Sequence, residues 1–316
     1  MVTTLSVQRA SSWANQSSRR VLSVALSALI VAGVLTGLGG LSRASAAGRA
    51  KASGTVDVLY AGSLLDLMEQ QIGPAFHKAT GYTVSGFSNG SSALATEIKG
   101  GTQVGDVFLS ASPTADTSLQ GSANGNWVSN YEEFATSPLV LGYNPSSKYA
   151  KDLLTKPWYD VVDLPNFLLG RTDPATDPKG VLAVDALTGV ALAFDVPRLN
   201  ALATSTSNVF PETALVGEIQ AGQLDAGFFY AVEASAAHLK TVALTETNLA
   251  AQYTLAILNR VPHEAAAKAF VKFLLSSAGH KILKKNGVTP VIPPRVSSAS
   301  SGATTTTTVA LSTTTT

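Results

Sequence analysis

The 316-residue chain contains no cysteine. It therefore has no disulfide, no thiolate metal ligand and no thiol nucleophile, and its fold must rest on a hydrophobic core. Charged residues are also scarce, at 14% of the chain, and the formal net charge is +1. Residues 1–46 hold four arginines and no acidic residue, so taking four from +1 leaves −3 for the remainder. A mildly acidic domain argues against nucleic acid as a partner.

The first 46 residues have the pattern of a targeting segment. Arg19 and Arg20 precede an apolar, uncharged run from Val21 to Leu41, and the sequence ASA at residues 44–46 matches an A-x-A cleavage site. The stretch SSRRVLS also resembles a twin-arginine export signal. An uncleaved anchor is the alternative, because the run is long enough to span a bilayer. Both interpretations predict an extracytoplasmic protein, in the periplasm or cell-wall space.

The opposite end of the chain is rich in threonine and serine. Residues 295–316 lack the apolar periodicity of a core, so we expect a disordered tail there. We interpret residues 47–54 as a linker. The remaining chain is long enough for one large domain or for two lobes of ordinary size. We assign 55–138 and 254–294 to lobe 1 and 139–253 to lobe 2.

Strand and helix patterns alternate through the first third of this globular part. Val56–Tyr60, Tyr82–Phe87 and Val107–Leu109 read as strands separated by helical periodicity. This alternation predicts an α/β fold with a largely parallel sheet. We expect Leu139–Tyr143 to cross into a second lobe and Tyr253–Leu258 to return from it.

Two serines follow the first two predicted strands. Ser63 lies in VDVLYAGSLL and Ser91 in FSNGSSALATEI, each where a helix is predicted to begin. Ligands of α/β folds bind at such strand ends, and helix N-termini attract anions. The pattern predicts a small oxoanion held by hydroxyl and N–H donors. The simpler alternative is that both serines only shape their turns.

Other kinds of chemistry have little support in the sequence. The four histidines (His77, His238, His263 and His280) do not have metal-ligand spacing, and we interpret all of them as surface helix residues. We expect no bare metal cation and no cofactor. No GxSxG nucleophile motif is present, so we predict a protein that is not an enzyme. Asp225 and Glu233 are interpreted as solvated.

A series of short motifs carries a family resemblance. AGSL, SSALATEI with GDVFLSAS, FATSPLVLGYN, DPATDPKG, GFFY and GHKILKKNGVTPV follow one another between Val56 and Pro293. In order and spacing they resemble the extracellular molybdate/tungstate-binding proteins of ABC transporters, which are periplasmic solute-binding proteins of the type II fold. The resemblance implies two α/β lobes joined by two hinge strands, with a cleft between them. It also implies a monomer that captures molybdate or tungstate and delivers it to a membrane permease.

The resemblance implies six anion-binding residues, which are Ser63, Ser91, Asp177, Lys179, Glu212 and Tyr230. Each serine would donate a hydroxyl and a backbone N–H. The backbone N–H of Lys179 would be another donor, Glu212 would contribute only its backbone N–H, and Tyr230 would donate its phenol.

The carboxylates of the site set this chain apart from the tungstate-preferring branch. Asp177 matches a carboxylate that approaches the central atom of the anion in that branch. A second carboxylate normally precedes the tyrosine, and this chain has Phe229 there. We therefore expect tetrahedral binding mainly by neutral donors. Such a site disfavours phosphate, whose hydrogen would lack an acceptor.

Alternative functions remain open at this stage. One is a binding protein of the same fold for sulfate, phosphate or ferric iron. The other is a secreted hydrolase, or an adhesion protein that uses the threonine-rich tail.

Overall fold

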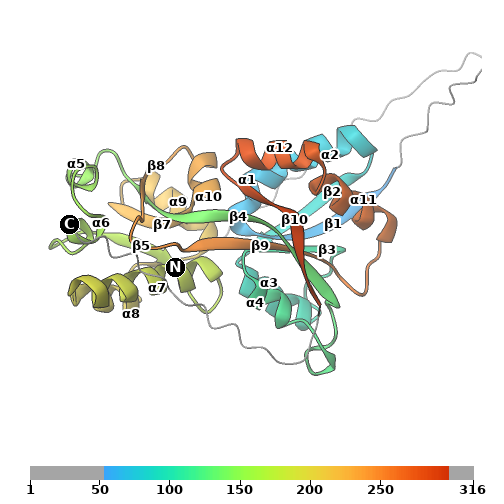
Figure 1. The fold of residues 1–316 in the computed structure, drawn as a ribbon, viewed down its shortest axis with the longest axis horizontal. Helices are drawn as coiled ribbons and strands as arrows, with labels where there is room; N and C mark the ends of the chain where they lie inside the picture. The colour runs from blue at the N-terminus through green and yellow to red at the C-terminus, as the bar shows by residue number, and fades with distance from the viewer. Residues whose placement is uncertain (1–52, 299–316) are drawn as a thin grey trace, which may run out of the picture. The chain divides into compact units, whose positions relative to one another are not determined.

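The computed structural model describes residues 53–298, which all belong to one compact unit (Figure 1). The predicted export signal or anchor, and residues 299–316 of the predicted tail, lie outside the described residues. Within 53–298, no helix combines the length and the apolar character needed to cross a bilayer.

The ten strands of the described residues are β1 (Thr55–Ala61), β2 (Thr83–Asn89), β3 (Val107–Ser110), β4 (Asn130–Tyr143), β5 (Leu169–Thr172), β6 (Val209–Phe210), β7 (Ala226–Tyr230), β8 (Lys240–Ala243), β9 (Ala250–Ile257) and β10 (Thr289–Ser298). The α-helices are α1 (Leu65–Leu67), α2 (Gly73–Thr80), α3 (Ser91–Lys99), α4 (Pro113–Thr117), α5 (Ala150–Leu153), α6 (Trp158–Val162), α7 (Pro178–Phe194), α8 (Arg198–Thr204), α9 (Glu212–Gln220), α10 (Ala231–Ala236), α11 (Glu264–Leu274) and α12 (Ser277–Lys285). Short 3-10 turns are η1 (Gly62–Leu64) and η3 (Ser122–Asn124), and η2 (Met68–Ile72) is a π-helical turn.

The first lobe is built on β1, which pairs in parallel with β2 on one side and β3 on the other. Its side chains alternate between two faces, as strand geometry requires. Val58 and Tyr60 join the core under α2 and α11, while Leu59 joins a second core with α3 and α4. Figure 1 shows these two pairs of helices on opposite faces of the sheet.

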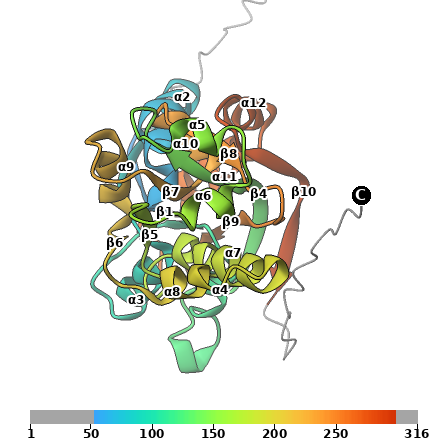
Figure 2. The same cartoon turned by 90° about the vertical axis from the view of Figure 1, so that its left-hand side faces the viewer.

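The second lobe repeats the arrangement around β5 and β7, which are parallel. Phe228 and Tyr230 of β7 belong to the core that contains α7, and Phe229 between them packs with Leu215 and Ile219 of α9. Figure 2 shows α7 and α9 on either side of these strands. Each lobe therefore has a central sheet with helices on both faces, as the predicted α/β class requires.

Two strands run between the lobes. The N-terminal part of β4, residues 130–138, pairs with β9 and β10. Its C-terminal part, residues 139–143, pairs with β7 and β8. β9 in turn pairs with β3 of the first lobe. β4 and β9 thus form the connection predicted from Leu139–Tyr143 and Tyr253–Leu258, although β4 begins earlier, at Asn130.

Two expectations were wrong. The sheet is mixed rather than largely parallel, because every described pairing of β4 and β9 is antiparallel. The predicted tail also starts too early, since residues 295–298 lie in β10 and pair with residues 130–133 of β4. This segment carries few core side chains, so its sequence resembles a tail although its backbone completes a sheet edge.

Candidate functional site

The two predicted serines lie where β1 and β2 end. Ser63 is in η1, directly after β1, and its hydroxyl hydrogen-bonds the hydroxyl of Tyr253 on β9 at 3.0 Å. Ser91 is the first residue of α3, and its Oγ accepts the N–H of Ala111 at 3.0 Å. Because that contact uses the oxygen as acceptor, the Ser91 hydroxyl hydrogen can be donated to another group. Both side chains are buried.

Asp177 fixes the start of the long helix α7 in the second lobe. It is the N-cap residue, and its Oδ1 accepts the backbone N–H of Lys179 at 2.9 Å. The predicted anion donor at Lys179 is therefore already engaged by the cap. The other oxygen, Oδ2, is buried and has no hydrogen-bond partner among the described residues.

The side chain of Lys179 is fully buried among carboxylates. Its Nζ lies 2.8 and 2.6 Å from the two carboxylate oxygens of Glu233, and 3.6 Å from Oε1 of Glu212. Burial alone would lower the pKa of Lys179, but these carboxylates and Asp177 outweigh it and hold the pKa above its ordinary value. The lysine is therefore a charged, paired group.

Glu212 begins α9 in the second lobe and reaches the serine turn of the first. A Cβ built on Gly62 would lie 2.3 Å from Glu212 Oε2, and the backbone N–H of Ser63 faces the carboxylate. Burial, and next the charge of Asp177, raise the pKa of Glu212 well above its ordinary value. The expectation that Glu212 offers only its backbone N–H is thus incomplete.

Tyr230 ends β7 and points its hydroxyl into the same cluster. The side chain is fully buried, its ring packs edge-on against Tyr253, and its Oη has no hydrogen-bond partner among the described residues. Burial and then the Asp177 carboxylate raise its pKa, so it stays a neutral hydroxyl. The Tyr230 hydroxyl is therefore a buried donor that an anion could satisfy, whereas Asp177 Oδ2 and Glu212 Oε2 are buried acceptors that need a proton or another donor.

The lobes touch at this cluster. The N–H of Ala93 in α3 donates to the carbonyl of Thr176 at 3.1 Å, and a Cβ on Gly90 would lie 2.3 Å from that carbonyl oxygen. The serine turns of lobe 1 thus face the start of α7 in lobe 2. All six predicted residues lie in or beside one buried region between the lobes.

Sequence reasoning missed two members of the cluster. Glu233 was interpreted as solvated, which is wrong, because it is buried and paired with Lys179. An acid among the small apolar residues AVEASAA, one helical turn after Tyr230, was the available signal. Tyr253 was treated only as part of a strand, although it bonds Ser63. The expected set of neutral donors is therefore joined by three carboxylates.

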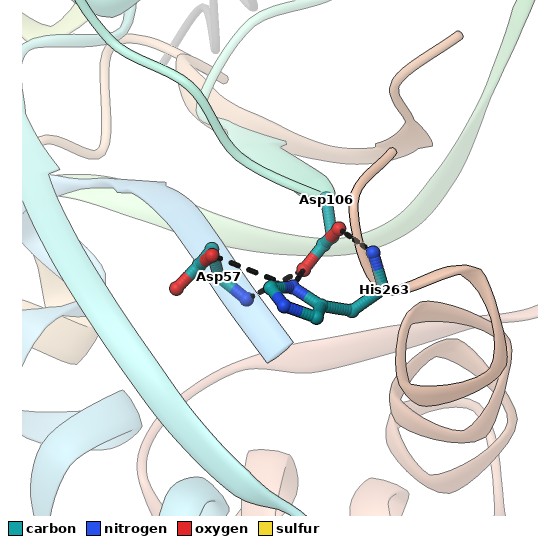
Figure 3. A group of neighbouring side chains, drawn as sticks. All are labelled: Asp57, Asp106 and His263. Carbon is teal, nitrogen blue, oxygen red and sulfur yellow. Dashed lines mark hydrogen bonds and ion pairs between the residues drawn. The ribbon is translucent and has the colours of Figure 1, made fainter. Parts of the chain in front are cut away.

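A separate cluster lies at the other end of β1 (Figure 3). The buried carboxylate of Asp106 accepts the backbone N–H groups of Asp57 and His263 at 2.8 and 2.7 Å, and the His263 Nδ1 lies 2.9 Å from it. His263 was expected to be a surface helix residue, but it precedes the first residue of α11. Both oxygens of Asp106 accept hydrogen bonds from protein groups, so this cluster connects β1, the residue preceding β3 and the residue preceding α11.

The comparisons with known proteins agree with this architecture. The sequence profile of the family described as bacterial extracellular solute-binding protein matches residues 56–289. A putative ABC transporter molybdenum-binding protein of Haloferax volcanii is 31% identical over 219 residues, covering 69% of this chain and 66% of that protein. The molybdate/tungstate-binding protein WtpA of Pyrococcus abyssi is 26% identical over 221 residues, covering 54% and 64%. The chain thus spans about two thirds of the length of these relatives.

Among solved structures, the periplasmic molybdate-binding protein of Azotobacter vinelandii is similar. It superposes with a TM-score of 0.56 at 20% identity, over 75% of this chain and 99% of that one. This likeness shows the fold, namely the two-lobe type II architecture of periplasmic binding proteins.

Proposed function

The chain belongs to the family of bacterial extracellular solute-binding proteins, and on that basis we propose that it captures molybdate or tungstate between its lobes. It then delivers the anion to the membrane permease of an ABC transporter. It acts outside the cytoplasm after export through its N-terminal segment, as a monomer and without catalysing a reaction. The names of the relatives from Haloferax and Pyrococcus support this ligand class.

One observation carries the proposal. Serine turns and helix starts from both lobes meet at a buried cluster in which the Tyr230 hydroxyl, a hydrogen-bond donor, has no acceptor among the described residues. Unpaired buried polar groups cost free energy, so native proteins keep them where a ligand satisfies them. The starts of α3, α7 and α9 add the positive ends of three helix dipoles, which favour an anion.

Calorimetry of the purified protein against tungstate, molybdate and sulfate tests the proposal. We expect binding of the first two and a much weaker response to sulfate. The double variant Ser63→Ala/Ser91→Ala should weaken binding by about a hundredfold or more, since each lost hydrogen bond to a charged ligand is worth about 1.5–3 kcal/mol. Ser85→Ala, an exposed position on β2, is the matched control and should bind normally.

Two results would sink the proposal. One is a wild-type protein that binds none of the tetrahedral oxoanions. The other is unchanged tungstate affinity in the double serine variant, which would move the site elsewhere. Preference for sulfate, phosphate or ferric iron would also overturn the proposed ligand, although the protein would still be a solute-binding protein.

A further inference from the structure

We propose that Glu212 is a built-in competitor for the anion: its carboxylate occupies the Gly62–Ser63 turn, and an oxoanion enters only when Glu212 takes up a proton. The inference rests on the proposed function, because it concerns the same region between the lobes. It adds a proton to the binding reaction and assigns that proton to one residue.

The placement of the side chain is the first argument. Glu212 comes from α9 of the second lobe and is only 8% exposed. Its Oε2 lies so close to the first-lobe turn that a Cβ added to Gly62 would be 2.3 Å from it. The Ser63 N–H, which the sequence predicts as an anion donor, faces this carboxylate. Since a carboxylate is itself an oxyanion, Glu212 holds the position on the turn that a ligand would take.

The second argument is that the charge of Glu212 is less compensated than that of Glu233, although Asp177 Oδ2 likewise has no hydrogen-bond partner among the described residues. Both oxygens of Glu233 contact Lys179 Nζ, at 2.8 and 2.6 Å. Asp177 caps α7, where the N–H of Lys179 and the helix dipole stabilise its charge. Glu212 lies 3.6 Å from the same Nζ, and its Oε2 has no hydrogen-bond partner among the described residues.

The third argument is the charge balance around this group. The titratable groups that face it are Asp177 and Lys179 from α7, Glu233 from α10, Tyr230 from β7 and Tyr253 from β9. One cation therefore meets three carboxylates before any ligand arrives. A dianion would add to this repulsion in a buried region, where charges interact strongly.

A proton on Glu212 relieves both difficulties. It removes one negative charge, and it converts a carboxylate, which only accepts hydrogen bonds, into a carboxyl group that donates one. The neutral group then releases the Ser63 N–H to the anion, and its O–H can donate to an oxygen of that anion from beside the turn. Burial and the Asp177 charge already raise the pKa of Glu212, so the group takes up a proton readily.

Calorimetry with tungstate between about pH 6.5 and about pH 8.5 tests the inference, with pairs of buffers that differ in ionisation enthalpy. We expect the wild-type Kd to rise by about tenfold per pH unit in the upper part of this range, with uptake of about one proton per tungstate. Glu212→Gln should bind tungstate with a nearly pH-independent Kd and more tightly than wild type at about pH 8.5. Glu218→Gln, on the same helix α9, should behave as wild type.

The outcomes separate the two proposals. Proton uptake that persists in Glu212→Gln, or wild-type binding without proton uptake, would overturn the role of Glu212 while leaving oxoanion binding intact. A wild-type protein that binds no oxoanion at any pH would refute the proposed function instead. The wild-type proton count needs no variant, so it tests the inference even if Glu212→Gln fails to fold.

Discussion

Replacing Lys179 with methionine should expose how strongly the buried ion pair holds the second lobe together. Lys179 Nζ is fully buried and lies within 2.8 Å of both oxygens of Glu233. Methionine keeps most of the side-chain volume but removes the charge. The perturbation therefore leaves a buried carboxylate without its cation, while α7 and α10 stay packed as before.

The expected loss follows from that geometry. Breaking a buried pair by removing one partner typically costs about 3–5 kcal/mol, because the remaining charge is uncompensated. With a urea m-value of about 3 kcal/mol/M, the unfolding midpoint should fall by roughly 1–2 M. The loss should be smaller at about pH 5 than at about pH 8, since Glu233 can then be neutralised by a proton.

Urea unfolding of four proteins measures the coupling: wild type, Lys179→Met, Glu233→Gln and the double variant. We expect the double variant to recover most of the stability, because it carries no buried charge from this pair. A loss below about 1 kcal/mol in Lys179→Met would show that the lysine is not a buried charged partner. Failure of Glu233→Gln to compensate would lead to the same conclusion.

Three further predictions concern other parts of the molecule. Burial raises the pKa of Asp116 to about 7, so the stability that this group contributes is full below its ordinary pKa of 3.8 and is lost as pH rises through 7. Melting temperatures of Asp116→Asn should therefore change less between these two pH values than those of the wild type. An unaltered pH profile in the variant would contradict this expectation. Asp106→Ala should lower the free energy of unfolding, measured by urea unfolding, by about 2–4 kcal/mol, because two backbone N–H groups lose their acceptor. A loss under about 1 kcal/mol would mean that Asp106 does not stabilise the contact between these segments. Gly90→Ala places a Cβ against the Thr176 carbonyl and should weaken tungstate binding by roughly tenfold or more with little change in melting temperature. Normal affinity would mean that tungstate binding does not need the lobes to approach each other at this contact.

Local patterns were enough to predict the elements that begin the site. Ser63 and Ser91 each follow an apolar strand and a small-residue turn, and the structure places them at the ends of β1 and β2. Strand ends and helix starts depend on neighbouring residues, so one sequence contains the signal. The α/β class followed from the order of such elements, and the two lobes joined by hinge strands were what the family resemblance implied.

Contacts between distant segments could not be predicted in the same way. Lys179 and Glu233 are paired only because α7 and α10 meet in the folded protein, and no local pattern encodes that meeting. The same limit explains His263, whose partner Asp106 lies far away in the chain. The antiparallel direction of β9 and the strand formed by residues 295–298 also depend on long-range pairing with β4.

The way β3 and β9 pair has a consequence for how the protein is made. Val107 pairs with Ile257, so one edge of β3 stays open until most of the chain has been synthesised. Contacts of such high sequence separation slow folding, and unpaired strand edges invite aggregation. A chain that emerges N-terminus first therefore passes through a long stage in which the first lobe lacks both β9 and α11. The sheet of the first lobe can therefore be completed only after β9 has been synthesised.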